Sequence, residues 1–152
     1  MSTRRRAREV AMQALFRYDV NPTTSPEEID AFLSGRLHFP ELETFCRSLV
    51  DGVRSNRQAI DATITDALEN WRMGRLAPVD RNVLRLAVYE LTVERGNPVA
   101  VVINESLEIC RRYSSAESVA FANGVLDRIA SQLQDKTTEG SDETISAATE
   151  EE

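Results

Sequence analysis

The sequence is poor in the residues that build disulfides and metal sites, with two cysteines and one histidine among 152 residues. Cys46 and Cys110 have no cysteine or histidine nearby, so we expect two small buried side chains instead of a disulfide or a zinc site. His38 lies near the end of a predicted helix, where we expect a surface or capping role. No apolar run approaches the ~18 residues of a membrane span, and the N-terminus lacks the apolar core of a secretory signal. We therefore expect a cytoplasmic protein without membrane contacts.

Enzyme signatures are also missing from the sequence. It contains no glycine-rich phosphate loop, no Gly-x-Ser-x-Gly turn and no group of His, Cys and carboxylate residues at metal-ligand spacing. We therefore expect a protein that is not an enzyme and that uses no cofactor or metal. Four carboxylates could meet in space, but nothing in their spacing favours a catalytic pair: Asp80, Glu90, Glu105 and Asp127.

Charge is segregated along the chain. Residues 135–152 contain seven acidic residues and one lysine, a net charge of −6, so that residues 1–134 carry only −1 of the total of −7. Residues 1–17 contain five arginines and one glutamate, a net charge of +4. Such asymmetry indicates interaction with a charged partner. Residues 135–152 also lack apolar periodicity, which predicts a disordered acidic tail behind a domain of residues 1–134.

Apolar residues recur at helical spacing along most of residues 1–134, and we expect an all-α protein of about seven helices. Residues 79–93 are apolar around most of the helical circumference, which predicts the central helix of a bundle. Residues 99–103 resemble a strand locally, but no partner strand exists, so we expect a helix there as well. The expected helices end near residues 20, 35, 55, 68, 93, 110 and 134. Three helix starts are predicted from capping patterns: Ser25 with Pro26 and Glu28, Asn97 with Pro98, and Ser114 with Glu117.

Four of the first eight residues are arginines, at the start of the first predicted helix. Each cation at a helix N-terminus costs ~0.3–1 kcal/mol at low salt, and we expect only Glu9 to be available to pair with these arginines. Because guanidinium groups bind phosphate through two hydrogen bonds, this placement predicts a basic face for a nucleic acid, with an ordinary solvated helix surface as the alternative. Helical winding places Arg4 and Arg8 beside the buried stripe and turns four polar residues away from it: Arg5, Arg6, Gln13 and Arg17.

Phe16 projects off the predicted buried stripe of the same helix, near Met12. An aromatic side chain in that position is either covered by a neighbouring helix or offered to a partner, and the sequence leaves both open.

Together these segments resemble the NusB family of transcription antitermination factors, over about residues 3–134. The resemblance rests on several blocks in a fixed order. They are Arg4-Arg5-Arg6-Ala7-Arg8-Glu9 with Gln13-Ala14-Leu15-Phe16, then Asp80-Arg81-x-Val83-Leu84-Arg85-Leu86-Ala87-x-Tyr89-Glu90-Leu91, Pro98 with Val102-Ile103-Asn104-Glu105, and Phe121-x-Asn123-Gly124-Val125-Leu126-Asp127.

The resemblance implies an all-α fold of two small packed helical bundles without catalytic activity. It implies binding to the single-stranded boxA element of nascent RNA together with the ribosomal protein NusE. That complex joins RNA polymerase and suppresses termination, notably in ribosomal RNA operons. Whether the free protein forms a homodimer is left open.

The resemblance also assigns residues to these two partners. For Phe121, the alternative to an implied RNA contact is a core position under the first helix. For the partner surface, Phe16 stands where the family often has tyrosine. For the motif residues inside helices we expect structural roles, with Asn104 and Asn123 bonding between helices, Glu105 also structural, and Gly124 allowing close backbone approach. RNA contacts are implied for Arg4, Arg5, Arg6, Arg8, Gln13, Glu117 and Phe121, and partner contacts for Phe16, Asp80 and Leu84.

Two other functions fit the same sequence. The same helical domain occurs at the N-terminus of certain ribosomal RNA cytosine methyltransferases, where it would place a catalytic domain on RNA. A helical adaptor that binds only proteins is the other alternative. The acidic tail is either a solubility segment or a competitor of RNA for the N-terminal arginines.

Overall fold

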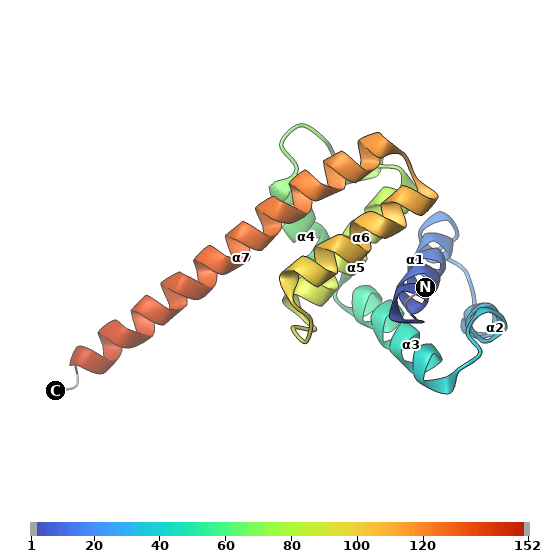
Figure 1. The fold of residues 1–152 in the computed structure, drawn as a ribbon, viewed down its shortest axis with the longest axis horizontal. Helices are drawn as coiled ribbons and strands as arrows, with labels where there is room; N and C mark the ends of the chain where they lie inside the picture. Colours follow the sequence, from blue (N-terminus) through green and yellow to red (C-terminus); the bar gives the residue numbers. More distant parts are fainter. Residues whose placement is uncertain (1–2, 151–152) are drawn as a thin grey trace.

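The computed structural model describes residues 3–150, and the side chains of residues 4–136. This part of the chain contains seven α-helices, one short 3₁₀ helix and no strand (Figure 1), which confirms the all-α prediction. α1 (Thr3–Val20), α2 (Pro26–Arg36) and α3 (Pro40–Ser55) pack on one another as a first bundle. The second bundle contains α4 (Arg57–Ala67), η1 (Met73–Arg75), α5 (Pro78–Thr92), α6 (Val99–Tyr113) and α7 (Ala116–Glu150).

α5 is the central helix, as its all-round apolar sequence predicted. It contacts α4, α6 and α7 in its own bundle and α1 and α3 in the other, and residues 82–88 are all buried. The crossing with α3 is close because Gly52 lies directly against Tyr89. A Cβ atom on Gly52 would lie 2.2 Å from the Tyr89 ring, so any other residue at this position would displace the Tyr89 side chain. α5 thereby joins the two bundles into one core.

Of the three predicted helix starts, the structure confirms one. Ser25 accepts a hydrogen bond from the Glu28 backbone N–H at 3.2 Å and caps α2, a contact that typically contributes ~1 kcal/mol. The prediction for Asn97 is wrong: Pro98 occupies the cap of α6, and the Asn97 amide donates instead to Glu90.

The prediction for Ser114 is also wrong, by one residue. Ser115 accepts from the Ser118 backbone N–H at 3.1 Å and therefore caps α7. The Ser114 hydroxyl donates to Asp80 at the start of α5. Both failures have the same physical cause, because each predicted capping side chain bonds instead to a carboxylate on α5 that the local capping pattern does not reveal.

The two cysteines are fully buried, as expected, and desolvation raises the pKa of each thiol to about 12. They are therefore inert small side chains of the core.

His38 is exposed, in agreement with its predicted surface position. Among the described residues, none of the helices combines the length and apolar character that crossing a bilayer requires.

α7 runs along α6 and then leaves the body of the molecule (Figure 1, orange to red). Its assigned helix extends to Glu150, although the side chains of residues 137–152 lie outside the described part of the chain. The predicted disordered tail of residues 135–152 falls mostly within this segment and stays a prediction.

Candidate nucleic-acid interface

The four N-terminal arginines have four different environments. Arg8 is buried in a bidentate ion pair with Glu90 of α5, with 5% of the Arg8 side chain and 2% of the Glu90 side chain exposed. The Arg8 Nε and Nη2 atoms lie 2.9 to 3.1 Å from the Glu90 carboxylate oxygens, and Asn97 adds a bond at 3.3 Å. This group ties α1 to α5 and to the loop before α6. A guanidinium enclosed in this way has almost no surface for RNA, which corrects the RNA contact implied for Arg8.

Arg5 is paired with Glu105 of α6 but remains part of the surface. Its Nε donates to Oε2 at 2.7 Å and its Nη2 donates to Oε1 at 3.1 Å, while 30% of the side chain is exposed. The hydrogen bonds from Arg5 and its charge hold the pKa of the Glu105 carboxyl below its ordinary value, although burial opposes them. Two edges of the guanidinium fork are therefore fixed, and Nη1 has no bonded acceptor among the described residues.

Glu9 is a buried carboxylate that accepts hydrogen bonds from side chains of two helices. It accepts from Arg6 of α1 at 3.3 Å, from Arg112 of α6 at 3.2 Å and from the Tyr113 hydroxyl at 3.2 Å. The side chains of Arg6 and Arg112 remain 37% and 48% exposed. Glu9 therefore sets two arginines side by side at the surface.

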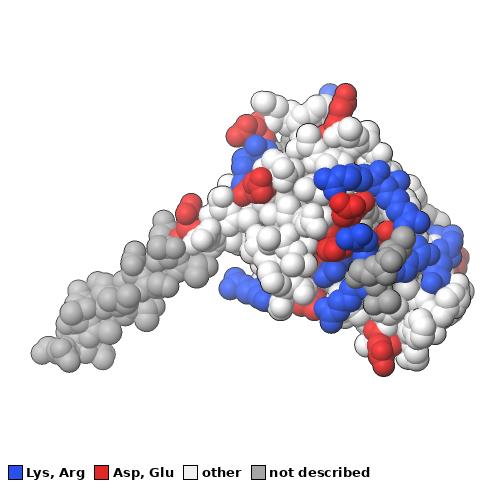
Figure 2. Space-filling view, in the orientation of Figure 1, with Lys and Arg blue, Asp and Glu red and all other residues white. Residues whose placement is uncertain are grey.

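Arg4 is exposed and stacks over Phe45 of α3, with its guanidinium carbon 4.7 Å from the ring centroid. Figure 2 shows basic side chains gathered over α1 and the end of α6, with acidic side chains between them. We define the N-terminal arginine cluster as Arg4, Arg5, Arg6 and Arg112. The prediction that only Glu9 would pair with the N-terminal arginines is wrong, because Glu90 and Glu105 from other helices also pair with them.

The other predicted RNA contacts lie on α1 and at the start of α7. Gln13 is half-buried and Glu117 is exposed. Phe121 is half-buried and packs against the core, and both its implied RNA contact and its alternative position under α1 stay predictions. The α6–α7 turn next to Glu117 is fixed by Asp80, because the hydroxyls of Ser114 and Ser118 each donate to one carboxylate oxygen at 2.8 Å.

The predicted partner residues are not equally accessible. Phe16 is half-buried on α1. Asp80 is 9% exposed, with both oxygens bonded to serines, so it orders the turn and presents little charge to a partner. Leu84 is fully buried in the core, so its side chain cannot contact a partner in this conformation. Leu84 belongs to a recognisable sequence block, and that block forms mainly the buried part of α5.

Sequence reasoning missed the acceptors that organise the arginines. Glu90 and Glu105 are 82 and 100 residues away from Arg8 and Arg5, and no sequence signal pairs them. Arg112 and Tyr113 were missed for the same reason. The expected interhelical bonds of Asn104 and Asn123 are wrong, since both side chains are exposed and make no described hydrogen bond. Gly124 permits no close approach, because nothing lies within 4 Å of a Cβ atom built there.

Comparison with known proteins settles the family of this chain. The model of the NusB family matches residues 5–131. The chain belongs to the NusB family. It is 43% identical over 146 residues to the transcription antitermination protein NusB of Geotalea daltonii, and the match covers 90% of this chain and 99% of that protein. Relatives of this family are named transcription antitermination proteins, and the chain is a transcription antitermination factor of this family.

Solved structures of the NusB family have the same fold. The NusB structure of T. maritima is 38% identical, with a TM-score of 0.76, and the match covers 84% of this chain and 90% of that one. A second match is to the antitermination factors NusB and NusE in complex with double-stranded RNA. It is 26% identical, with a TM-score of 0.79, and covers 87% of this chain and 98% of the other.

Proposed function

We propose that this chain binds boxA-type single-stranded RNA together with the ribosomal protein NusE. The resulting complex joins RNA polymerase and suppresses termination, notably in ribosomal RNA operons. The observation that carries the proposal is the N-terminal arginine cluster, in which partly exposed guanidinium groups are fixed by carboxylates or by an aromatic ring. A relative of the same family has been solved with both NusE and RNA, which supports both partners.

Fixed arginines suit the binding of a flexible polyanion. A free arginine side chain loses rotamer freedom when it contacts a phosphate, whereas Arg5 and Arg6 are already ordered by Glu105 and Glu9. Five arginines meet three glutamates in this region if Arg8 and Glu90 are included, a net charge of +2. The cluster therefore attracts phosphates through its surplus charge, and its ordered forks favour bidentate bonds. Unpaired bases would stack on exposed guanidinium planes or on the open side of Phe121.

For the protein partner, we propose the surface around the half-buried Phe16. The end of α1 is tied to the loop before α5 by Arg81, which donates to Asp19 at 2.8 Å and to the carbonyl of Met73 at 3.1 Å. Val20 on α1 and Trp71 in that loop are large apolar side chains that are more than half exposed. An apolar surface of this kind on ordered elements suits a protein partner, and the ring of Phe16 contributes apolar contact without a hydroxyl.

One titration tests the RNA part. Fluorescently labelled boxA-like RNA is titrated with the wild type and with Arg4→Ala/Arg5→Ala/Arg6→Ala, each with and without NusE and at several salt concentrations. Arg8 is left in place because it is structural. If three arginines neutralise phosphates, the wild-type logarithm of affinity falls with log salt at a slope of about −2. The triple variant loses this slope and most of its affinity.

The control removes the same charge elsewhere. Arg72, Arg75 and Arg95 are exposed and belong to segments other than α1, and Arg72→Ala/Arg75→Ala/Arg95→Ala keeps the wild-type affinity for RNA in the absence of NusE. A salt-independent wild type, or equal losses in the two triple variants, contradicts the RNA proposal and favours a protein-only adaptor. Phe16→Ala separates the two partners, because it weakens the effect of NusE and leaves binding of RNA alone unchanged.

A further inference from the structure

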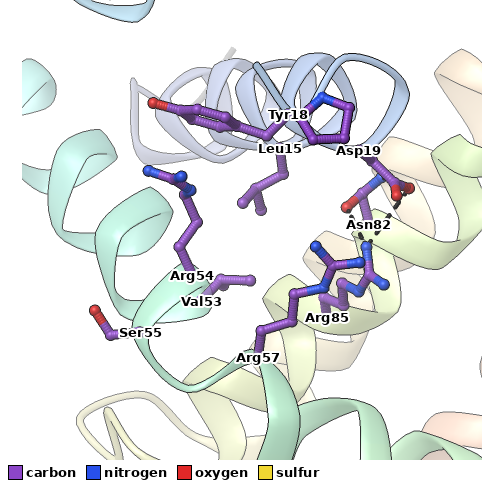
Figure 3. Close-up of a pocket in the computed structure, with 10 residues that line it drawn as sticks. Leu15, Tyr18, Asp19, Val53, Arg54, Ser55, Arg57, Asn82 and Arg85 are labelled. Carbon is purple, nitrogen blue, oxygen red and sulfur yellow. Dashed lines mark hydrogen bonds and ion pairs between the residues drawn. The ribbon is translucent and has the colours of Figure 1, made fainter. Parts of the chain in front are cut away.

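A second arginine-rich region lies at the other end of α1. A cavity of about 340 Å³ opens between the C-terminal end of α1, the joint between α3 and α4, and α5. Figure 3 shows the side chains of Arg54, Arg57 and Arg85 rising from α3, α4 and α5 toward the underside of α1. Tyr18 and Arg5 are thirteen positions apart on α1, which corresponds to about 20 Å of helix. This cavity is therefore separate from the N-terminal arginine cluster.

The charges around this cavity do not balance. Asp19 is 2.7 Å from Arg81 and also accepts from Asn82 at 3.0 Å, so its charge is already matched. Asp61 is shared between Arg85 at 2.8 Å and Arg57 at 3.6 Å. Arg54 makes no ion pair or hydrogen bond with any described residue and is placed only by stacking on Tyr18, 3.7 Å from the ring centroid. Four arginines thus face two aspartates, a surplus of +2.

The surplus of positive charge affects the pKa of Asp19 and the bonding of Arg85 inside the cavity. Burial alone would raise the pKa of Asp19, but hydrogen bonds from Arg81 and Asn82 and the charges of Arg81 and Arg85 lower it below its ordinary value. Arg85 is almost fully buried, with 6% of its side chain exposed, and it bonds to both aspartates. The back of the cavity is therefore held by ion pairs and hydrogen bonds, while Arg54 and Arg57 at its opening have exposed side chains.

We propose that this cavity is a binding site for a phosphate group. A phosphate carries up to two negative charges, which matches the surplus, and its tetrahedral oxygens accept hydrogen bonds from several directions, as guanidinium groups on separate helices require. Ser55 also lines the cavity. Leu15 and Val53 form an apolar wall, and the volume suits a phosphorylated small molecule or one nucleotide of an RNA backbone.

The test measures phosphate binding directly on the intact protein. Inorganic phosphate and adenosine monophosphate are titrated in constant ionic strength, and binding is followed by calorimetry and by the NMR signals of the Asn82 side-chain amide. The test variant is Arg54→Ala/Arg57→Ala, which removes two exposed arginines and leaves the buried Arg85 intact. The charge-matched control is Arg72→Ala/Arg75→Ala. Thermal unfolding establishes that both variants fold as the wild type does.

We expect saturable binding that shifts the Asn82 signals and weakens at least tenfold in Arg54→Ala/Arg57→Ala, with no change in the control. Arg4→Ala/Arg5→Ala/Arg6→Ala retains this binding, so the result is independent of the function proposed above. Absence of saturable binding, equal losses in test and control variants, or shifts confined to the N-terminal cluster overturn the proposal. Acetate that competes as well as phosphate also overturns it, because the site would then recognise carboxylates.

Two further measurements identify the source of the phosphate group. A boxA-length RNA and an RNA extended by ten nucleotides at each end are titrated with the wild type and with Arg54→Ala/Arg57→Ala. Weaker binding of the extended RNA alone assigns the site to the RNA backbone. Unchanged binding of both RNAs, with tight binding of adenosine monophosphate, assigns it to a free nucleotide. Both results support recognition of phosphate by the cavity.

Discussion

Arg5 and Arg8 lie one turn apart on α1 and make the same bidentate bond to a glutamate, yet their surroundings differ. The Arg8–Glu90 pair is enclosed, with 5% and 2% of the side chains exposed, while 30% of the Arg5 side chain and 14% of the Glu105 side chain remain exposed. In the enclosed pair, water cannot reach either charge, so each charge is stabilised mainly by the other. In the exposed pair water can replace either partner, and a phosphate can approach the arginine. The comparison shows that one sequence block, Arg4-Arg5-Arg6-Ala7-Arg8-Glu9, contains both an arginine enclosed in the core and an arginine left at the surface, where we propose that RNA binds.

The largest expected effect comes from breaking the enclosed pair. Arg8→Ala leaves the Glu90 carboxylate buried with only the Asn97 amide, which costs about 3–5 kcal/mol of unfolding free energy. Urea unfolding at pH 7 measures this loss. The double variant Arg8→Met/Glu90→Leu removes both charges and recovers most of the stability. A loss below 1 kcal/mol in Arg8→Ala would contradict the account of this pair.

The exposed pair is expected to affect RNA binding more than stability. Arg5→Ala leaves the urea midpoint close to that of the wild type, because water solvates Glu105 once Arg5 is gone. The slope of log affinity for boxA-like RNA against log salt becomes less negative by about 0.7, the contribution of one phosphate contact to single-stranded RNA. Arg17→Ala, an exposed arginine farther along the same helix, provides the control and leaves the slope unchanged.

The stability contributed by the Arg5–Glu105 pair is expected to depend on pH. The pKa of Glu105 is lowered by Arg5 in the folded protein, so its ionised form stabilises the fold above the pKa of the unfolded state, about 4.3. That contribution disappears as the pH falls through the lower folded-state pKa. A small stability advantage of the wild type over Glu105→Gln is therefore present at pH 7 and absent near pH 3. Unfolding curves of the two proteins at both pH values measure this difference in stability. A wild-type advantage that is larger at pH 3 than at pH 7 would contradict the assigned effect of Arg5 on Glu105.

The smallest effect is expected from the acidic segment. Residues 136–152 have a net charge of −5, and removing them should tighten RNA binding at 20 mM salt if they compete with RNA for the N-terminal arginine cluster. The difference vanishes at high salt because the interaction is screened. A truncated protein with unchanged affinity at low salt leaves the segment with a role in solubility only.

The sequence predicted local features well and distant pairings poorly. The central position of α5 followed from its apolar circumference, and the start of α2 followed from Ser25, Pro26 and Glu28, which all lie within one turn. Ser114 has a capping pattern of the same kind, yet its hydroxyl bonds to Asp80, 34 residues away. Leu84 belongs to a recognisable block and was assigned to a partner surface, but the packing of five helices around α5 buries it.

The order of helices, the inert cysteines and the accumulation of arginine at the N-terminus were determined by the sequence alone, because each depends on neighbours within a few residues or on composition. Tertiary structure decided which arginines are available to a partner. Glu90 and Glu105 come from helices far along the chain, and the depth at which each glutamate meets α1 determines whether its arginine is enclosed or exposed. The same is true of the second arginine site, which exists only because α3, α4 and α5 meet beneath α1. The sequence determines which residues are charged, but the residues that the fold packs around each charge determine how far water solvates it.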